Sequence, residues 1–104
     1  MASIEQQIRD AVPQQLARAA QFDDKGYLPM AEWAERDGTM PCLVNLTGRA
    51  ERNIHRAWGA AFNATAPNDE FPLEAEKART NLLDCMNLCA LALSLLPSEA
   101  LDDR

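Results

Sequence analysis

Residues 82–96 form the most apolar stretch of the chain, and they constrain its fold more than any other segment. Only Asp84, Asn87 and Ser94 interrupt the run. A helix that is apolar nearly all round must be covered on several sides, yet the whole chain has 104 residues. The sequence therefore predicts a helical protein that completes its core with a second copy of itself, as a dimer or larger, or with a partner.

The length predicts a single helical domain, residues 1–104, near the lower limit for a self-sufficient core. Only 6% of the residues are aromatic, so the core is expected to consist mainly of Ala and Leu in closely packed helices. The formal net charge of −6 argues against general binding to nucleic acid or to an anionic membrane, because both need cationic side chains.

The expected location is the cytoplasm. The apolar run is shorter than the roughly 20 residues that cross a bilayer, and the N-terminal residues lack the basic and apolar regions of a secretory signal. Three cysteines, an odd number, fit a reducing compartment better than a disulfide framework.

Two shorter helices are expected in the N-terminal part. Ser3 and Gln6 have the spacing of a capping box, and apolar residues at helical spacing continue to Phe22. Pro13 predicts a kink, or two short helices that meet there, because proline removes an amide and crowds the preceding turn. A second helix is predicted over residues 29–36, with Gly38 placed to end it.

Two long helices are expected to follow, at about 41–65 and 72–96. In both, apolar residues recur in steps of three and four, the spacing of one helical face; in the second, this pattern makes a heptad seam with another apolar seam beside it. The short connection makes the pair antiparallel neighbours. The predicted fold class is therefore all-α, a bundle of about four helices built on a long hairpin. The apolar positions are Leu43, Leu46, Thr47, Ala50, Ile54, Ala57, Trp58 and Ala61 in the first, then Ala75, Ala78, Leu82, Cys85, Cys89, Ala92 and Leu96, with Leu83, Met86, Ala90 and Leu93 beside them.

Several residues on these helices have simple packing interpretations. Trp33, Trp58 and Phe62 are expected in the core. Gly48 and Gly59 each lower helix propensity by about 1 kcal/mol relative to alanine, or else they allow a close backbone approach. The residues from Tyr27 to Met30 fit either a cap on the bundle or an interface anchor.

The cysteines and the single histidine do not predict a metal site. Cys42, Cys85, Cys89 and His55 supply a zinc-type ligand set on paper, but His55 lies about 20 Å from Cys42 along the helix axis. Cysteines in the core are therefore expected, with no metal and no cofactor. No catalytic motif occurs, so no catalytic residue is assigned and the chain is not expected to be an enzyme.

An arginine stripe is the first candidate binding feature. Arg49, Arg52 and Arg56 recur at helical spacing on the side opposite the predicted apolar face. Guanidinium groups at this spacing can hold a phosphate or an acidic partner surface. The alternative is an ordinary solvated helix face whose arginines pair with nearby carboxylates.

Asp84 and Asn87 are the second candidate feature, one turn apart in the most apolar part of the chain. Burying an unpaired carboxylate is costly, so Asp84 is expected to pair with an arginine of the preceding helix, Arg52 or Arg56, or to face water at a groove. The two residues then either line a ligand groove or form a buried polar pair that fixes helix register.

Two segments carry a family resemblance. They are Arg49-Ala50-Glu51-Arg52 and, some thirty residues later, the segment of residues 82–91 around Asp84 and Asn87. With these the chain resembles small phage helical proteins, the MazG-like and nucleotide-modification-associated domains. The resemblance covers about half of the chain, and it implies a nucleotide-facing groove between helices lined by Arg49, Arg52, Asp84 and Asn87.

The chain departs from that family pattern at two points. Leu88 stands where the pattern has a tyrosine, and Glu70, Glu74 and Glu76 do not reproduce the acidic motif that binds magnesium in the active pyrophosphohydrolases. The resemblance therefore implies nucleotide binding or a degenerate relation to these enzymes rather than hydrolysis.

Three functions remain open from the sequence. The leading hypothesis is a non-catalytic oligomeric binding protein, such as a phage-encoded accessory or anti-defence inhibitor that occupies a host protein surface. The alternatives are a nucleotide-binding protein and a structural chaperone or assembly factor. The candidate ligand- or partner-binding residues are Arg49, Arg52, Arg56, Asp84 and Asn87.

Overall fold

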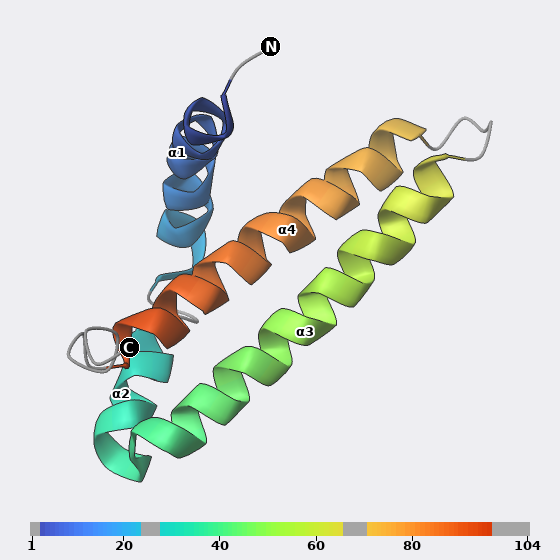
Figure 1. Cartoon of the computed structure of the whole chain (residues 1–104). Coiled ribbons are helices and arrows are strands. Elements are labelled where there is room, and N and C mark those ends of the chain that lie inside the picture. The colour runs from blue at the N-terminus through green and yellow to red at the C-terminus, as the bar shows by residue number, and fades with distance from the viewer. Residues whose placement is uncertain (1–2, 24–27, 66–70, 97–104) are drawn as a thin grey trace.

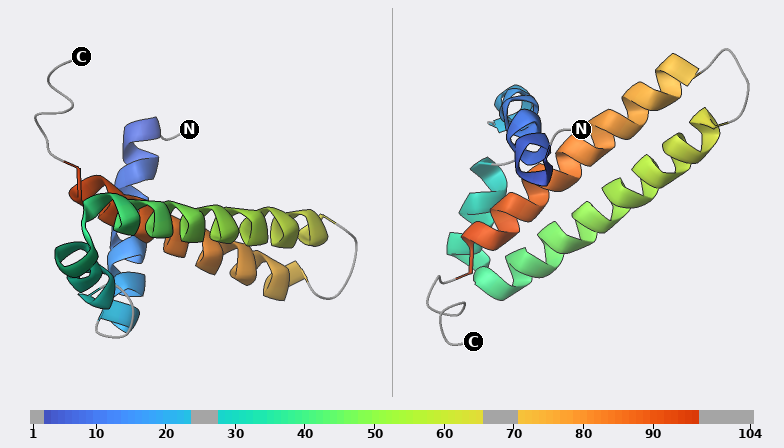
Figure 2. Two further views of the ribbon diagram at one scale, coloured as in Figure 1. Left: turned by 90° about the horizontal axis from the view of Figure 1, so that it is seen from below. Right: turned by 45° about the horizontal axis from the view of Figure 1, so that its top comes forward.

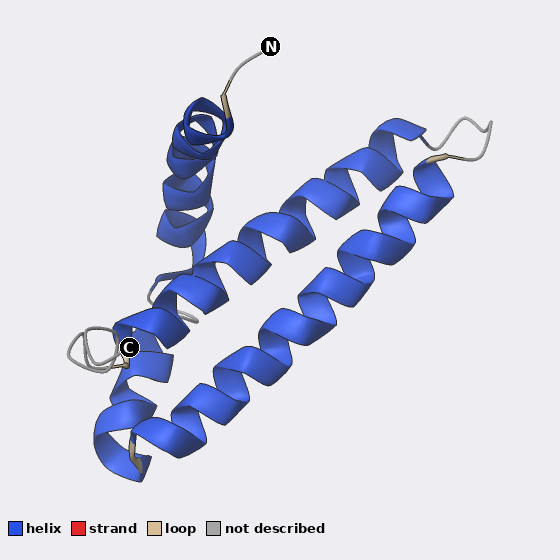
Figure 3. Cartoon of the chain, in the orientation of Figure 1, coloured by secondary structure: helices blue, strands red, loops and turns tan. Residues whose placement is uncertain are grey.

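The computed structural model describes residues 3–23, 28–65 and 71–96, and this part of the chain is helical throughout apart from short turns (Figure 3). The four helices are α1 (Ile4–Phe22), α2 (Leu28–Asp37), α3 (Thr39–Ala64) and α4 (Phe71–Ser94). The predicted all-α fold is confirmed, and the long helices begin and end within two residues of their expected bounds. Within these described ranges, no helix combines the length and apolar character that a membrane span requires.

A long hairpin of α3 and α4 forms the frame of the molecule. The two helices lie side by side along their whole length (Figure 1). α1 crosses α4 steeply at the edge away from α3, and α2 packs against the beginning of α3 (Figure 2). The N-terminal helices therefore cover one edge of α4 and the first turns of α3, and they leave the rest of the hairpin open.

α1 begins as its sequence predicts but does not break. Ser3 is the N-cap, and its hydroxyl accepts a hydrogen bond of 3.1 Å from the Gln6 amide. The Gln6 side chain donates to Asp10 instead of completing the capping box. Of the two alternatives at Pro13, two short helices are wrong, because α1 is one helix of 19 residues with Pro13 inside it. A kink within this helix stays a prediction. None of its described residues is buried.

A single glycine separates α2 from α3. Gly38 has φ +98°, a conformation that costs glycine little and other residues more. Its amide donates to the Ala34 carbonyl at 3.1 Å, which ends α2 as predicted. The chain can therefore reverse in one residue and bring α2 onto the first turns of α3.

The core is small and lies where α2 meets the hairpin. Leu46, only 1% exposed, is its centre, and the largest described buried cluster surrounds it. Farther along the hairpin, Ala57 and Ala60 are buried between the long helices, because small side chains let two helices approach closely. The members of the main cluster are Met30, Cys42, Leu46, Ala50, Leu88 and Ala92.

Several residues predicted in the core lie outside it. Trp58 and Phe62 are 69% and 65% exposed, and their rings stack on each other at 5.8 Å. Cys89 is exposed as well, whereas Trp33 packs against the core as expected. The physical reason is the close contact at Ala57 and Ala60, which turns the bulkier side of α3 away from α4.

The two glycines within α3 do not serve a close backbone approach in the described chain. A Cβ added at Gly59 would have no neighbour within 4 Å, and one at Gly48 would meet only the guanidinium of Arg52, at 3.9 Å. Of the residues from Tyr27 to Met30, Tyr27 lies outside the described residues, while Met30 is part of the core.

Candidate functional site

All four helices contribute to a groove beside the hairpin, on the side where α1 ends and α2 begins. Its volume is about 340 Å³. Four of the five predicted site residues line this groove, namely Arg49, Arg52 and Arg56 of α3 and Asp84 of α4. The structure therefore brings most of the predicted site together. We call it the arginine groove; its lining residues are Arg18, Phe22, Met30, Arg49, Arg52, Asn53, Arg56, Asp84 and Leu88.

Helical spacing explains why α3 supplies four of these side chains. Arg49, Arg52, Asn53 and Arg56 are separated by three or four residues and so share one side of the helix. The sequence predicted the arginines opposite the apolar face, as a binding stripe or, alternatively, as an ordinary solvated helix face. Instead this side of α3 faces α1 and α2 across the groove, because α1 crosses α4 and brings its C-terminal turns over the hairpin (Figure 2).

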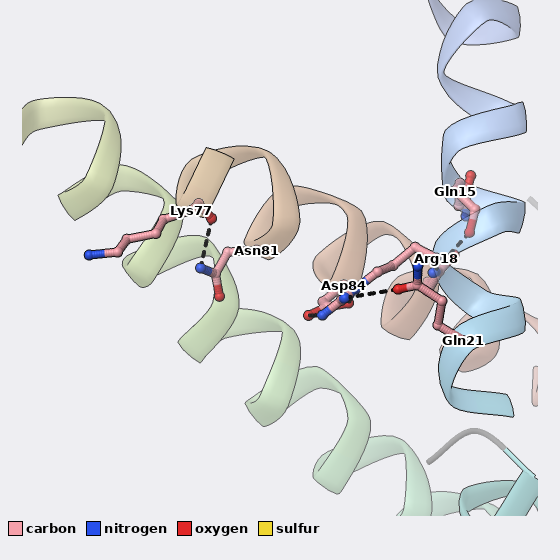
Figure 4. Close-up of polar contacts among 7 residues, drawn as sticks. Gln15, Arg18, Gln21, Lys77, Asn81 and Asp84 are labelled. Carbon is pink, nitrogen blue, oxygen red and sulfur yellow. Dashed lines mark hydrogen bonds and ion pairs between the residues drawn. The ribbon is translucent and has the colours of Figure 1, made fainter. Parts of the chain in front are cut away.

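Arg18 and Asp84 form the best-defined polar contact of the groove. Arg18 Nε and Nη2 donate to the two carboxylate oxygens of Asp84 at 2.7 and 3.0 Å (Figure 4). The two side chains are 22% and 23% exposed. Such a two-point contact fixes the relative orientation of the groups as well as their distance. It therefore fastens α1 to the middle of α4.

Two more contacts hold the Arg18 guanidinium. Its Nη1 donates to Gln21 at 3.2 Å (Figure 4), and its central carbon lies 4.2 Å from the centroid of the Phe22 ring. Asp84 was expected to pair with Arg52 or Arg56 of α3 or to face water at a groove. The pairing with α3 is wrong, whereas Asp84 does line a groove and stays partly exposed. The sequence reasoning missed Arg18, because no periodic signal shows which side of α1 meets α4.

Asn87 lies outside the arginine groove. Its buried side-chain amide donates to the Gln15 carbonyl of α1 at 3.2 Å. A buried amide hydrogen-bonded to the backbone of a crossing helix fixes that crossing. The alternative interpretation as a polar residue that sets helix register therefore describes Asn87 better than a ligand-facing role.

Arg49 is the inner arginine of the groove. It is half-buried, and its guanidinium carbon lies 5.6 Å from the centroid of the Trp33 ring, a cation–π arrangement. Its Nε is buried and has no hydrogen-bond partner within the described residues. A buried donor without an acceptor is costly. The Arg49 side chain that carries this atom lines the groove, so an anion bound there would be stabilised by its charge.

Arg52 and Arg56 form the outer rim of the groove. Both are exposed, and neither forms an ion pair with a carboxylate in the described part of the chain. The four arginines of the lining outnumber its one aspartate, so the lining carries a formal charge of +3 in a chain whose formal net charge is −6. The local charge therefore favours an anion.

The floor of the groove is apolar. Phe22, Met30 and Leu88 lie between the charged side chains, and Leu88 also belongs to the core. These floor residues were not predicted, because their membership depends on how α1 and α2 fold back. The lining offers many hydrogen-bond donors and little that could act as a base, since both oxygens of Asp84 accept from Arg18. The arrangement suits binding of an anion that has an apolar part.

The cysteines and the histidine are not part of this groove. Cys42 is buried and its thiol lies 3.3 Å from the Met30 carbonyl. Burial raises the pKa of the Cys85 thiol, and the neighbouring Cys89 raises it further. His55 is exposed, 3.7 Å from Glu51. No group of three or more His, Cys, Asp or Glu side chains suited to a metal ion occurs among the described residues.

Comparison of the chain with protein-family models, curated proteins and solved structures finds no match.

Proposed function

We propose that this protein is a non-catalytic binding protein whose arginine groove holds a phosphate-bearing small ligand of the nucleotide class. The observation that carries the proposal is the set of three α3 arginines, Arg49, Arg52 and Arg56, which lack carboxylate partners in the described chain and surround an apolar floor. Guanidinium groups bind phosphate oxygens with two parallel hydrogen bonds. The floor suits a base or another flat apolar group.

The depth of the groove divides the arginines between two roles. Arg49, half-buried against Trp33 with a partnerless Nε, is suited to a phosphate oxygen in the interior. Arg52 and Arg56 at the rim add charge that attracts an anion and are screened by salt. The volume of about 340 Å³ lies at the lower end of the range for small-molecule sites, so the proposed ligand is a mononucleotide rather than an oligonucleotide.

A protein partner is the second candidate, and the exposure of Arg52 and Arg56 favours it. Two rim guanidiniums can bind an acidic segment that lies across the groove without entering it. This version keeps the hypothesis of a host protein whose surface is occupied by a phage-encoded inhibitor. The two proposals differ at Arg49, which nucleotide binding requires and binding of an acidic protein segment does not.

The test is isothermal titration of the whole chain with inorganic phosphate, AMP, ATP and cyclic AMP at low salt. A charge-assisted hydrogen bond contributes about 1.5–3 kcal/mol, so Arg49→Gln and Arg52→Gln should each weaken nucleotide binding by about tenfold or more. The matched control is Arg9→Gln, which removes the same charge at an exposed site on α1 and should leave affinity nearly unchanged.

The outcomes separate the candidates. Loss of binding in Arg49→Gln supports the nucleotide. Absence of heat and of thermal stabilisation with every compound at millimolar concentration overturns it, because ligand at 100 times its dissociation constant stabilises by about 2.7 kcal/mol. Binding of an acidic peptide that depends on Arg52 and Arg56 but not on Arg49 supports the protein partner instead.

A further inference from the structure

The side of the α3–α4 hairpin opposite the arginine groove is apolar and open. At 100° per residue, Ile54 and Trp58 lie about half a turn round α3 from Arg49 and Arg56. Leu82, Met86 and Leu93 lie about half a turn round α4 from Asp84. We call this surface the hairpin apolar face; it comprises Ile54, Trp58, Ala61, Leu82, Met86 and Leu93.

The two helices present this face on the same side. Ala61 of α3 lines a depression of about 610 Å³ together with Leu82 and Met86 of α4. Gln14 of α1 reaches the same depression, so α1 borders the face without covering it. Large side chains on the face stay exposed, among them Trp58 at 69% and Leu93 at 64%.

The surface of the chain is too large for a compact monomer. Its solvent-accessible area is 7609 Å², whereas a compact protein of 11.5 kDa exposes about 5,800 Å². Its radius of gyration is 15.9 Å, against about 13 Å for a compact chain of this length. The excess of about 1,800 Å² per chain is larger than the roughly 800 Å² that each partner of a stable interface buries, and the exposed side chains of the hairpin apolar face contribute to it.

We propose that a second copy of this chain docks on the hairpin apolar face. The contact is isologous, so each copy presents the same face, and the two hairpins together form a four-helix bundle of the usual kind. The bundle covers the apolar seams of α4 that one copy leaves exposed. The arginine grooves lie on the outer sides of this dimer and stay accessible, so the proposal does not depend on the proposed ligand.

The test is light scattering coupled to size exclusion, on the whole chain at micromolar concentration. We expect a mass of twice 11.5 kDa for the wild type. Leu82→Glu and Trp58→Glu should each give the mass of one chain, since an isologous contact brings the introduced carboxylates of both copies into the interface. Far-UV circular dichroism should show retained helix content, because both positions are exposed in a single copy.

The matched control is Leu16→Glu on α1, another exposed leucine, which should remain dimeric. The milder Leu82→Ala should weaken the dimer by about tenfold and keeps the test valid if a glutamate variant does not fold. A monomeric wild type overturns the proposal, as does a dimer that survives both Leu82→Glu and Trp58→Glu. Dissociation by Leu16→Glu alone also overturns it, because the contact would then lie on α1.

Discussion

The two sides of the α3–α4 hairpin carry opposite chemistry on the same pair of helices. One side holds the arginine groove, with a lining charge of +3, and the other holds the hairpin apolar face. A step of two residues along α3, from Arg56 to Trp58, is enough to pass from one to the other. The difference shows that helical period alone can give one small hairpin two surfaces of opposite character.

Salt should act on these surfaces in opposite directions. It screens the attraction between the arginine groove and an anion, so ligand binding weakens. It also screens the repulsion between two copies that each carry a formal charge of −6, so association through the apolar face strengthens. If the same electrostatic attraction drove ligand binding and dimer formation, salt would weaken both.

The largest expected effect comes from the core that lies between the two surfaces. Leu46→Ala removes the centre of the buried cluster and should lower the free energy of unfolding by about 3 kcal/mol. Val44→Ala, two residues away on an exposed part of α3, should change it by less than about 0.5 kcal/mol. Urea unfolding followed by circular dichroism measures both.

Equal effects of Leu46→Ala and Val44→Ala would mean that Val44 is covered in the protein as it exists in solution. The contact with a second copy would then extend along α3 beyond the hairpin apolar face.

A smaller effect is expected at the ion pair that fastens α1 to the groove side of the hairpin. Asp84→Asn leaves the half-buried Arg18 without its carboxylate and should lower the free energy of unfolding by about 2 kcal/mol. Glu5→Gln breaks the Arg9–Glu5 pair, in which both arginine nitrogens donate to one carboxylate oxygen. Its side chains are 73% and 70% exposed, so the change should cost less than about 0.5 kcal/mol.

Asp84→Asn also tests whether the arginine groove and the hairpin apolar face act independently. Because α1 supplies Arg18 and Phe22 to the arginine groove, Asp84→Asn should weaken ligand binding while the dimer persists. Loss of the dimer in Asp84→Asn, with helix content retained, would contradict the independence of the two surfaces.

The sequence predicted the hairpin well because its signals are local. Each signal depends only on residues within one or two helical turns. These signals are the steps of three and four residues, the proline near the beginning of α4, and Gly38. The grouping of Arg49, Arg52 and Arg56 follows from the same local spacing. Their surroundings do not, since Arg18 and Phe22 reach the groove only through the crossing of α1 over α4.

The wrong assignment of Trp58 and Phe62 to the core has a physical cause. The predicted apolar face of α3 includes both Ala57 and Trp58, which are adjacent in sequence and 100° apart on the helix. Periodicity cannot decide which of them faces α4. Close packing decides it, because alanines allow the shorter distance between the helices.

The smallest expected effect concerns Cys85 and Cys89, which lie one turn apart on α4. Burial raises the pKa of Cys85 above its ordinary value of 9.0, with a further contribution from Cys89, so the folded protein favours the neutral thiol. This contribution to stability is complete below the ordinary pKa and is lost as the pH rises through the raised value. The melting temperature should therefore fall more steeply above pH 9.0 in the wild type than in Cys85→Ala.

Cys89→Ala is the matched control for this slope. It should keep most of the pH dependence, because burial is the larger cause of the raised pKa of Cys85. Comparing slopes rather than melting temperatures removes the packing cost of each substitution. If Cys89→Ala abolishes the slope and Cys85→Ala does not, then Cys89 is the buried thiol in solution. Since Cys89 is exposed in a single copy, that result would require a covering neighbour beside the hairpin apolar face.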